Sequence, residues 1–134
     1  MIKLTREDFS LDEVLVSLRK KTVGGIVFFI GTVRGESKVG DVTRMEIEVY
    51  PEMVMSQLQT IRQEAIVRFG VEDIYIIHRY GDLKIMDNIV LVAVSAAHRS
   101  EAFEACHYVI DELKKRVPIW KREHTKKGVH WLEG

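Results

Sequence analysis

The chain carries one uninterrupted run of β-branched and aromatic residues, Ile26-Val27-Phe28-Phe29-Ile30, between Gly25 and Gly31. Such a run is typical of a strand that is buried on both faces, and the flanking glycines mark its ends. We therefore expect this strand to be central in a sheet, with the other elements arranged around it.

Helical and strand patterns alternate on both sides of this run. Upstream, Ser10 and Glu13 have the spacing of a capping box ahead of an apolar stripe, which predicts a helix from about Leu11 to Lys20. Further elements are predicted downstream by period-two alternation, by a proline-to-glycine helix signature and by turn residues. They are a strand at 44–49, a helix at 51–69, strands at 74–80 and 88–97, a helix at 100–117, and a hairpin at 119–124 and 129–132.

The last predicted helix begins where Ser100 can serve as its N-cap, and Pro118 ends it. Its apolar residues recur at helical spacing, which predicts a buried stripe. The stripe consists of Phe103, Cys106, Ile110, Leu113 and Val117.

The order of helix, two strands, helix, two strands, helix, two strands predicts an α+β fold with a mostly antiparallel sheet and three helices. The length of 134 residues and the absence of a linker-like stretch predict a single domain that spans residues 1–134.

Composition excludes several classes of partner. Lys plus Arg (20) equals Asp plus Glu (20), so there is no overall positive field for a nucleic-acid backbone. No window has the length of a signal peptide or of a membrane span, and a single cysteine cannot form an internal disulfide. We expect a cytoplasmic protein that binds neither nucleic acid nor membrane.

Three cations lie at the ends of predicted elements. Arg34 follows the buried run in a glycine-containing loop, and His98 and Arg99 precede a helix N-terminus, where free N–H groups attract anions. Each of them is a candidate contact for a phosphate or a carboxylate. The alternative is that these are solvated surface charges with no ligand.

Lys114 and Lys121 form a second candidate group on either side of Pro118. Several further basic residues follow them, so the last quarter of the chain is locally cationic although the whole chain is neutral. Crowded cations and partial burial both lower the pKa of a lysine toward the range in which it acts as a base. The alternative is that these lysines only complement the dipole of a helix end.

Other residues predict no chemistry of their own. Cys106 lies on the apolar stripe of its helix, which favours a small core residue over a nucleophile. The histidines do not have the spacing of metal ligands, and no phosphate-binding glycine loop occurs. We therefore predict neither a metal site nor a bound cofactor.

Several motifs together resemble the large, catalytic subunit of molybdopterin synthase, the MoaE family. They are Gly31-Thr32-Val33-Arg34, Ser95-Ala96-Ala97-His98-Arg99-Ser100, the segment 113–123, Tyr50-Pro51-Glu52-Met53, His78-Arg79-Tyr80-Gly81 and Trp131. Their order and spacing are similar to those of the family over nearly the whole chain. The chain departs from the family at Met86, where relatives often carry glycine.

The resemblance implies an α/β-hammerhead-like fold and a homodimer. It also implies a heterotetramer, in which two copies of a small ubiquitin-like sulfur-carrier subunit flank that dimer. The C-terminal Gly-Gly of the small subunit would carry a thiocarboxylate and enter a pocket of this chain. The implied reaction transfers two sulfurs, one from each of two such tails, to cyclic pyranopterin monophosphate and makes the dithiolene of molybdopterin.

The resemblance also implies roles for individual residues. Lys114 would lie beside the thiocarboxylate and Lys121 would contact the pterin, and both would assist proton transfer. The phosphate and the pterin would be held by Arg34, His98 and Arg99, the last two from the second copy, in a pocket lined by Phe29 and Ile110. A different hypothesis is a binding module that captures the carboxyl end of the tail through the same basic groove and has no catalytic activity.

Overall fold

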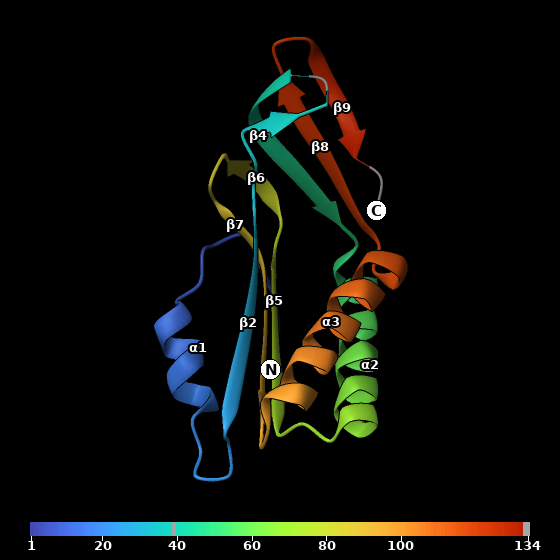
Figure 1. Ribbon diagram of the computed structural model, residues 1–134. Helices are drawn as coiled ribbons and strands as arrows, with labels where there is room; N and C mark the ends of the chain where they lie inside the picture. Colours follow the sequence, from blue (N-terminus) through green and yellow to red (C-terminus); the bar gives the residue numbers. More distant parts are fainter. Residues whose placement is uncertain (39, 133–134) are drawn as a thin grey trace.

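Figure 1 shows the computed structural model, which describes residues 1–38 and 40–132. The chain folds into two sheets that follow one another along the long axis of the molecule, with one helix on one side of the first sheet and two on the other. The elements are β1 (Ile2–Thr5), α1 (Leu11–Leu18), β2 (Gly25–Thr32), β3 (Glu36–Ser37), β4 (Gly40–Val49), α2 (Pro51–Phe69), β5 (Asp73–Arg79), β6 (Gly81–Lys84), β7 (Asn88–Ala96), α3 (Arg99–Arg116), β8 (Ile119–Thr125) and β9 (Gly128–Leu132).

The first sheet has the strand order β1-β5-β7-β2. The expectation that the run Ile26–Ile30 would be central is wrong, because β2 is an edge strand and the most deeply buried strand is β7. Ile26, Phe28 and Ile30 pack with α1, whereas Val27 joins the core beneath α2 and α3. Helices therefore cover one face of β2 and the Val27 part of the other, where Phe29 stays 38% exposed. An apolar run can therefore occur on an edge strand, because it does not show how many strands flank it.

The second sheet has the order β3-β4-β8-β9, and β6 also pairs with β4. β4 alternates as predicted, since Met45 and Ile47 are buried while Arg44 and Glu48 are exposed. The predicted hairpin β8–β9 is confirmed. The short strand β6 was not predicted; it starts at Gly81 directly after β5 and carries the chain from the first sheet into the second.

The first two helices begin close to where the sequence predicts. The Oγ of Ser10 accepts a hydrogen bond from the backbone N–H of Glu13 at 3.2 Å, although α1 ends two residues earlier than expected. α2 runs from Pro51 to Phe69, and Gly70 ends it in the left-handed conformation with φ 66°.

The predicted start and stripe of α3 need correction. The N-cap is His98, so Ser100 lies inside the first turn. Phe103 is 61% exposed, because α3 approaches the sheet through smaller residues. The fully or nearly fully buried residues of α3 are Ala102, Ala105, Cys106 and Val109. A bulky side chain at the contact would hold the helix further from the sheet.

The predicted fold class, α+β with three helices and mostly antiparallel strands, is confirmed for the described residues. The strand pairs are antiparallel except that the unpredicted strand β1 runs parallel to β5. Among the described residues, no helix is both long enough and apolar enough to cross a membrane.

Candidate active site

A cleft of about 340 Å³ lies where α3 ends and β8 begins. Pro118 excludes the helical conformation at Val117, whose ψ of 124° turns the chain out of α3 and into the second sheet. The cleft is lined by His78, Leu113, Lys114, Val117, Pro118, Ile119, Trp120, Lys121 and Leu132. The structure therefore brings both sequence-predicted lysines to one concave site.

Lys121 extends from the inner face of the second sheet. Its register partners are Ile47 on β4 and Leu132 on β9, so its stem lies among apolar neighbours. Burial lowers the pKa of the Lys121 ammonium, and the positive charge of Lys114 lowers it further. A larger share of its amine is therefore neutral near pH 7 than for an ordinary lysine, which suits it to accept a proton.

Lys114 reaches the same cleft from the last turn of α3 and is exposed. It makes no hydrogen bond or ion pair with any described residue. Its neighbour Lys115 lies 3.6 Å from a carboxylate oxygen of Glu112 and does not line the cleft. The cation of Lys114 thus remains available to an incoming anion.

Arg34 lies at the same end of the first sheet as His78. It follows β2, and its position is set by a hydrogen bond from the Val33 N–H to the carbonyl of Asp87 at 3.0 Å. β2 and β5 flank β7, so their backbones are about 10 Å apart. Arg34 is exposed and is not among the residues that line the cleft.

His98 and Arg99 lie at the other end of α3. Lys114 is fifteen positions after Arg99, which corresponds to about 22 Å along the helix axis. Both residues are exposed, and Arg99 packs against the start of β2, where a Cβ on Gly25 would lie 3.5 Å from its Cα. One copy of the chain therefore does not bring these cations to the lysines.

The two apolar candidates do not line the cleft either. Phe29 is on the edge strand β2 and is 38% exposed. Ile110 is partly buried against the main core, one turn before Lys114 on α3. Their place in the single chain leaves Phe29 open to a neighbouring molecule and gives Ile110 a packing role.

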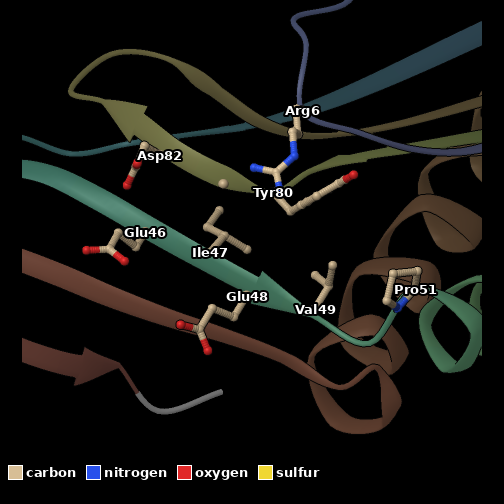
Figure 2. A pocket seen from close by; sticks show the side chains of 9 residues that line it. Arg6, Glu46, Ile47, Glu48, Val49, Pro51, Tyr80 and Asp82 are labelled. Carbon is tan, nitrogen blue, oxygen red and sulfur yellow. The ribbon is translucent and has the colours of Figure 1, made fainter.

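A second hollow, of about 550 Å³, lies on the other side of β4 and is lined by carboxylates (Figure 2). Its carboxylates are Glu46, Glu48 and Asp82, and its cation, Arg6, is stacked over the ring of Tyr80 at 4.6 Å. These carboxylates already pair with Arg44 or Arg122, so Arg6 is the one cation that lines the hollow among the described residues and a phosphate or carboxylate ligand would meet little free positive charge there. We therefore take the smaller cleft with the two lysines as the candidate anion-binding site.

Comparison with known proteins places the chain in a family. The family model described as MoaE protein matches residues 4–116. The chain belongs to the MoaE family. It is 47% identical to the molybdopterin synthase catalytic subunit of Pyrococcus abyssi over 96% of this chain and 86% of that protein. It is 40% identical to the catalytic subunit of Ralstonia nicotianae over 98% of this chain and 76% of that protein.

Two solved structures share the fold of this chain. Molybdopterin synthase from Staphylococcus aureus has a TM-score of 0.92 at 32% identity, over 98% of this chain and 96% of that chain. A complex of subunits 1 and 2 of molybdopterin-converting factor from Helicobacter pylori shares the fold, with a TM-score of 0.78 at 21% identity, over 97% of this chain and 88% of that chain. As a MoaE-family member, the chain is a sulfur-transferring enzyme of molybdenum cofactor biosynthesis.

The cysteine of this MoaE chain does not lie in the cleft. Cys106 is 4% exposed, and burial raises the pKa of its thiol to about 11. Burial therefore disfavours a thiolate there, and the prediction that Cys106 is a small core residue is confirmed.

Sequence reasoning missed two residues of the cleft, His78 and Trp120. His78 was rejected as a metal ligand and quoted as part of a family motif, but it was given no role in the site. It occupies the same face of β5 as Ile74 and Ile76, where a polar side chain is unusual. Trp120 makes an edge-to-face contact with Tyr50, with ring centroids 5.1 Å apart. The period-two pattern of β5 was a usable signal for His78, because it placed an imidazole on the core face.

Proposed function

We propose that this chain transfers sulfur from the C-terminal thiocarboxylate of a small ubiquitin-like subunit to cyclic pyranopterin monophosphate in the cleft of Lys114 and Lys121. The observation that supports this is the meeting of two lysines from different elements in one cleft, with the pKa of Lys121 lowered. The cleft suits an anionic tail, and the enzyme class is that of the family.

The chemistry requires charge stabilisation and proton transfer, and lysines provide both. In each transfer the sulfur forms a bond to a substrate carbon, and the bond from that carbon to an oxygen substituent breaks, so that the oxygen leaves as water or stays on the phosphate. The bond between the sulfur and the carbonyl carbon of the tail then breaks. Water supplies the oxygen with which the tail leaves as a carboxylate. Lys114, fully available, would pair with the thiocarboxylate, and Lys121, held among apolar neighbours, would exchange a proton with the substrate.

The remaining site residues require a second copy of the chain. Arg34 and Phe29 would help to hold the phosphate and pterin from the same copy, and Ile110 would back the pocket. We propose that His98 and Arg99 come from the partner in a homodimer, since about 22 Å of helix separates Arg99 from Lys114 within one copy. Symmetric dimers commonly build such shared sites.

The edge strand β2 supports this dimer. It has eight residues, none of them charged or proline, and such an edge readily pairs with another chain. If two β2 strands paired antiparallel, the Gly25 end of one copy would lie beside the Thr32 end of the other. Because Arg99 packs on Gly25 and Arg34 follows Thr32, that pairing would bring Arg99 of one copy toward Arg34 of the other.

A protein partner completes the proposal. The relatives are named as subunits, and the Helicobacter pylori structure is a complex of two subunits. We propose a heterotetramer with two small subunits on one homodimer, each supplying a thiocarboxylated Gly-Gly tail, and we place the reaction in the cytoplasm.

The proposed roles are tested in a reconstituted assay with thiocarboxylated small subunit and cyclic pyranopterin monophosphate. Lys114→Ala and Lys121→Ala should each slow molybdopterin formation by at least about 100-fold. Lys115→Ala is the matched control, since it removes an adjacent cation outside the cleft and should leave the rate within about twofold. Normal rates in the first two variants would refute the assignment. If the chain only docked the tail, the two lysine variants would bind the tail more weakly, and the parent chain itself would form no molybdopterin.

Sharing of the site between copies is tested by complementation. Lys121→Ala and Arg99→Ala chains, each inactive by itself, are co-expressed so that mixed dimers form. A shared site predicts one intact site in each mixed dimer, and hence about a quarter of the parent activity. If each site were built within one copy, the mixture would stay inactive.

A further inference from the structure

His78 is a buried imidazole at the back of the lysine cleft. It is the penultimate residue of β5, it is 1% exposed, and it is among the residues that line the cleft. The alternation of β5 aims it at the side of the sheet that α2 and α3 cover, as for Ile74 and Ile76. The established activity of the family does not by itself require a histidine at this place.

The hydrogen bond of the ring fixes its tautomer. Nδ1 lies 2.7 Å from the backbone carbonyl oxygen of Arg79, and a carbonyl oxygen can only accept. Nδ1 therefore carries the proton. Burial, together with the positive charge of Lys121, lowers the pKa of His78 to about 4, so the ring is neutral near pH 7. Nε2 then has a free lone pair, and no described residue donates a hydrogen bond to it.

The other polar side chains that line the cleft are donors. Lys114 and Lys121 present ammonium groups, and Trp120 can only donate through its indole N–H. A ligand with nothing but negative charge would satisfy these donors but displace water from Nε2 and leave it unpaired, which is costly. The cleft is therefore complementary to a ligand that combines an anionic group with an N–H group.

We propose that Nε2 of His78 accepts a hydrogen bond from an N–H group of the bound ligand and thereby orients it against Lys121. This inference rests on the proposed function, in which the ligand is either the pterin ring or the terminal amide of the tail. His78 is thus a ligand-orienting residue that acts without changing its protonation state.

A structural role for His78 makes a different prediction, because Nδ1–H also holds the backbone carbonyl of the next residue, Arg79, at the end of β5. Two substitutions separate the roles. The amide of Asn reaches the place of Nδ1 and preserves that anchor, whereas the amide of Gln reaches the place of Nε2 and can preserve the acceptor. A ligand-orienting role predicts that His78→Gln is the better enzyme, and a purely structural role predicts that His78→Asn is.

The experiment measures kcat and both KM values in the reconstituted assay, with thermal midpoints recorded for each variant. We expect His78→Asn to raise one KM about tenfold with little change in kcat, and His78→Gln to stay within about threefold of the parent chain. A rise in the KM of the pterin assigns the donor to the small molecule, and a rise in that of the small subunit assigns it to the tail. If the two variants were equally active, or if His78→Asn were more active than His78→Gln, the inference would be overturned.

Two further measurements keep the test decisive. The ¹⁵N resonance of Nε2 in the parent chain should be that of an unprotonated nitrogen and should shift when ligand is added; an unchanged resonance contradicts the proposal even if the variants fail to fold. In a Lys121→Met background, His78→Asn should still weaken ligand binding. If it did not, Nε2 would interact only with Lys121, and the inference would be overturned. Loss of the proposed function itself is recognised separately, because the parent chain would then form no molybdopterin.

Discussion

Replacing Met86 by glycine should stabilise the protein. Met86 has φ 74°, a left-handed conformation that costs a residue with a Cβ about 1 to 2 kcal/mol. It is the third residue of a turn closed by a hydrogen bond from the Asp87 N–H to the carbonyl of Lys84 at 3.1 Å. Since Ile85 does not have positive φ, the turn is of type II, which favours glycine at this position.

The size of the effect follows from three contributions. Glycine relieves the left-handed cost but loses about 0.5 to 1 kcal/mol through the greater freedom of the unfolded chain. The side chain of Met86 is 83% exposed, so its loss removes little packing. The net gain should be about 0.5 to 1 kcal/mol, or roughly 2 to 4 °C in the thermal midpoint for a chain of this size. The turn also holds Val33, through the Met86 N–H at 2.8 Å, so the loop of Arg34 should keep its place.

The measurement is urea unfolding at a fixed protein concentration, because the midpoint of an oligomer depends on concentration. Met86→Ala is the matched control, since it removes the long side chain but keeps the Cβ. Met86→Asn should fall between the two, as asparagine tolerates the left-handed region better than most residues. If alanine stabilised as much as glycine, the gain would come from removing exposed apolar surface, and the conformational reasoning would be refuted.

Three further variants probe the site and its supports. Gly24→Ala should destabilise by about 2 kcal/mol in thermal unfolding, because a Cβ there would lie 2.2 Å from the carbonyl oxygen of Ala97; an unchanged midpoint would contradict that clash. Lys114→Met should raise the pKa of the Lys121 amine, measured by NMR, because one of the two causes that lower it is removed; a constant pKa would show that burial alone sets it. Cys106→Ala should cost about 1 kcal/mol of stability yet keep full sulfur transfer, and loss of transfer would implicate the thiol.

Local signals predicted local structure well. Pro51 and Gly70 mark the ends of α2 because each has a backbone conformation suited to its place, whatever lies elsewhere in the chain. For the same reason the cluster of Lys114 and Lys121 could be anticipated. A helix end, a proline and a strand start keep them close along the chain, so their convergence needed little tertiary information.

Features that depend on sheet order could not be predicted. β1 has four residues and owes its place to a parallel partner more than 70 positions away, and β2 shows its edge position only once the neighbours of β7 are known. His78 reaches the cleft because β5 ends beside the junction of α3 and β8, a meeting that no local pattern encodes. Likewise, the distance of Arg99 from Lys114 becomes an argument for a second copy only when α3 is seen as one continuous helix.

Adjacent cations on β8 have opposite roles because the strand is pleated. Lys121 faces inward to the cleft, whereas Arg122 faces outward, donates to Glu46 and Glu48 at 2.9 and 2.8 Å, and stacks over the ring of Trp131 at 4.7 Å. Arg122→Met should therefore lower the thermal midpoint by a few degrees and spare sulfur transfer, while Lys121→Met should abolish transfer without such a loss, since it removes a partly buried charge. If the two variants changed the thermal midpoint and the rate of sulfur transfer in the same way, the opposite faces of Lys121 and Arg122 would not explain their different roles.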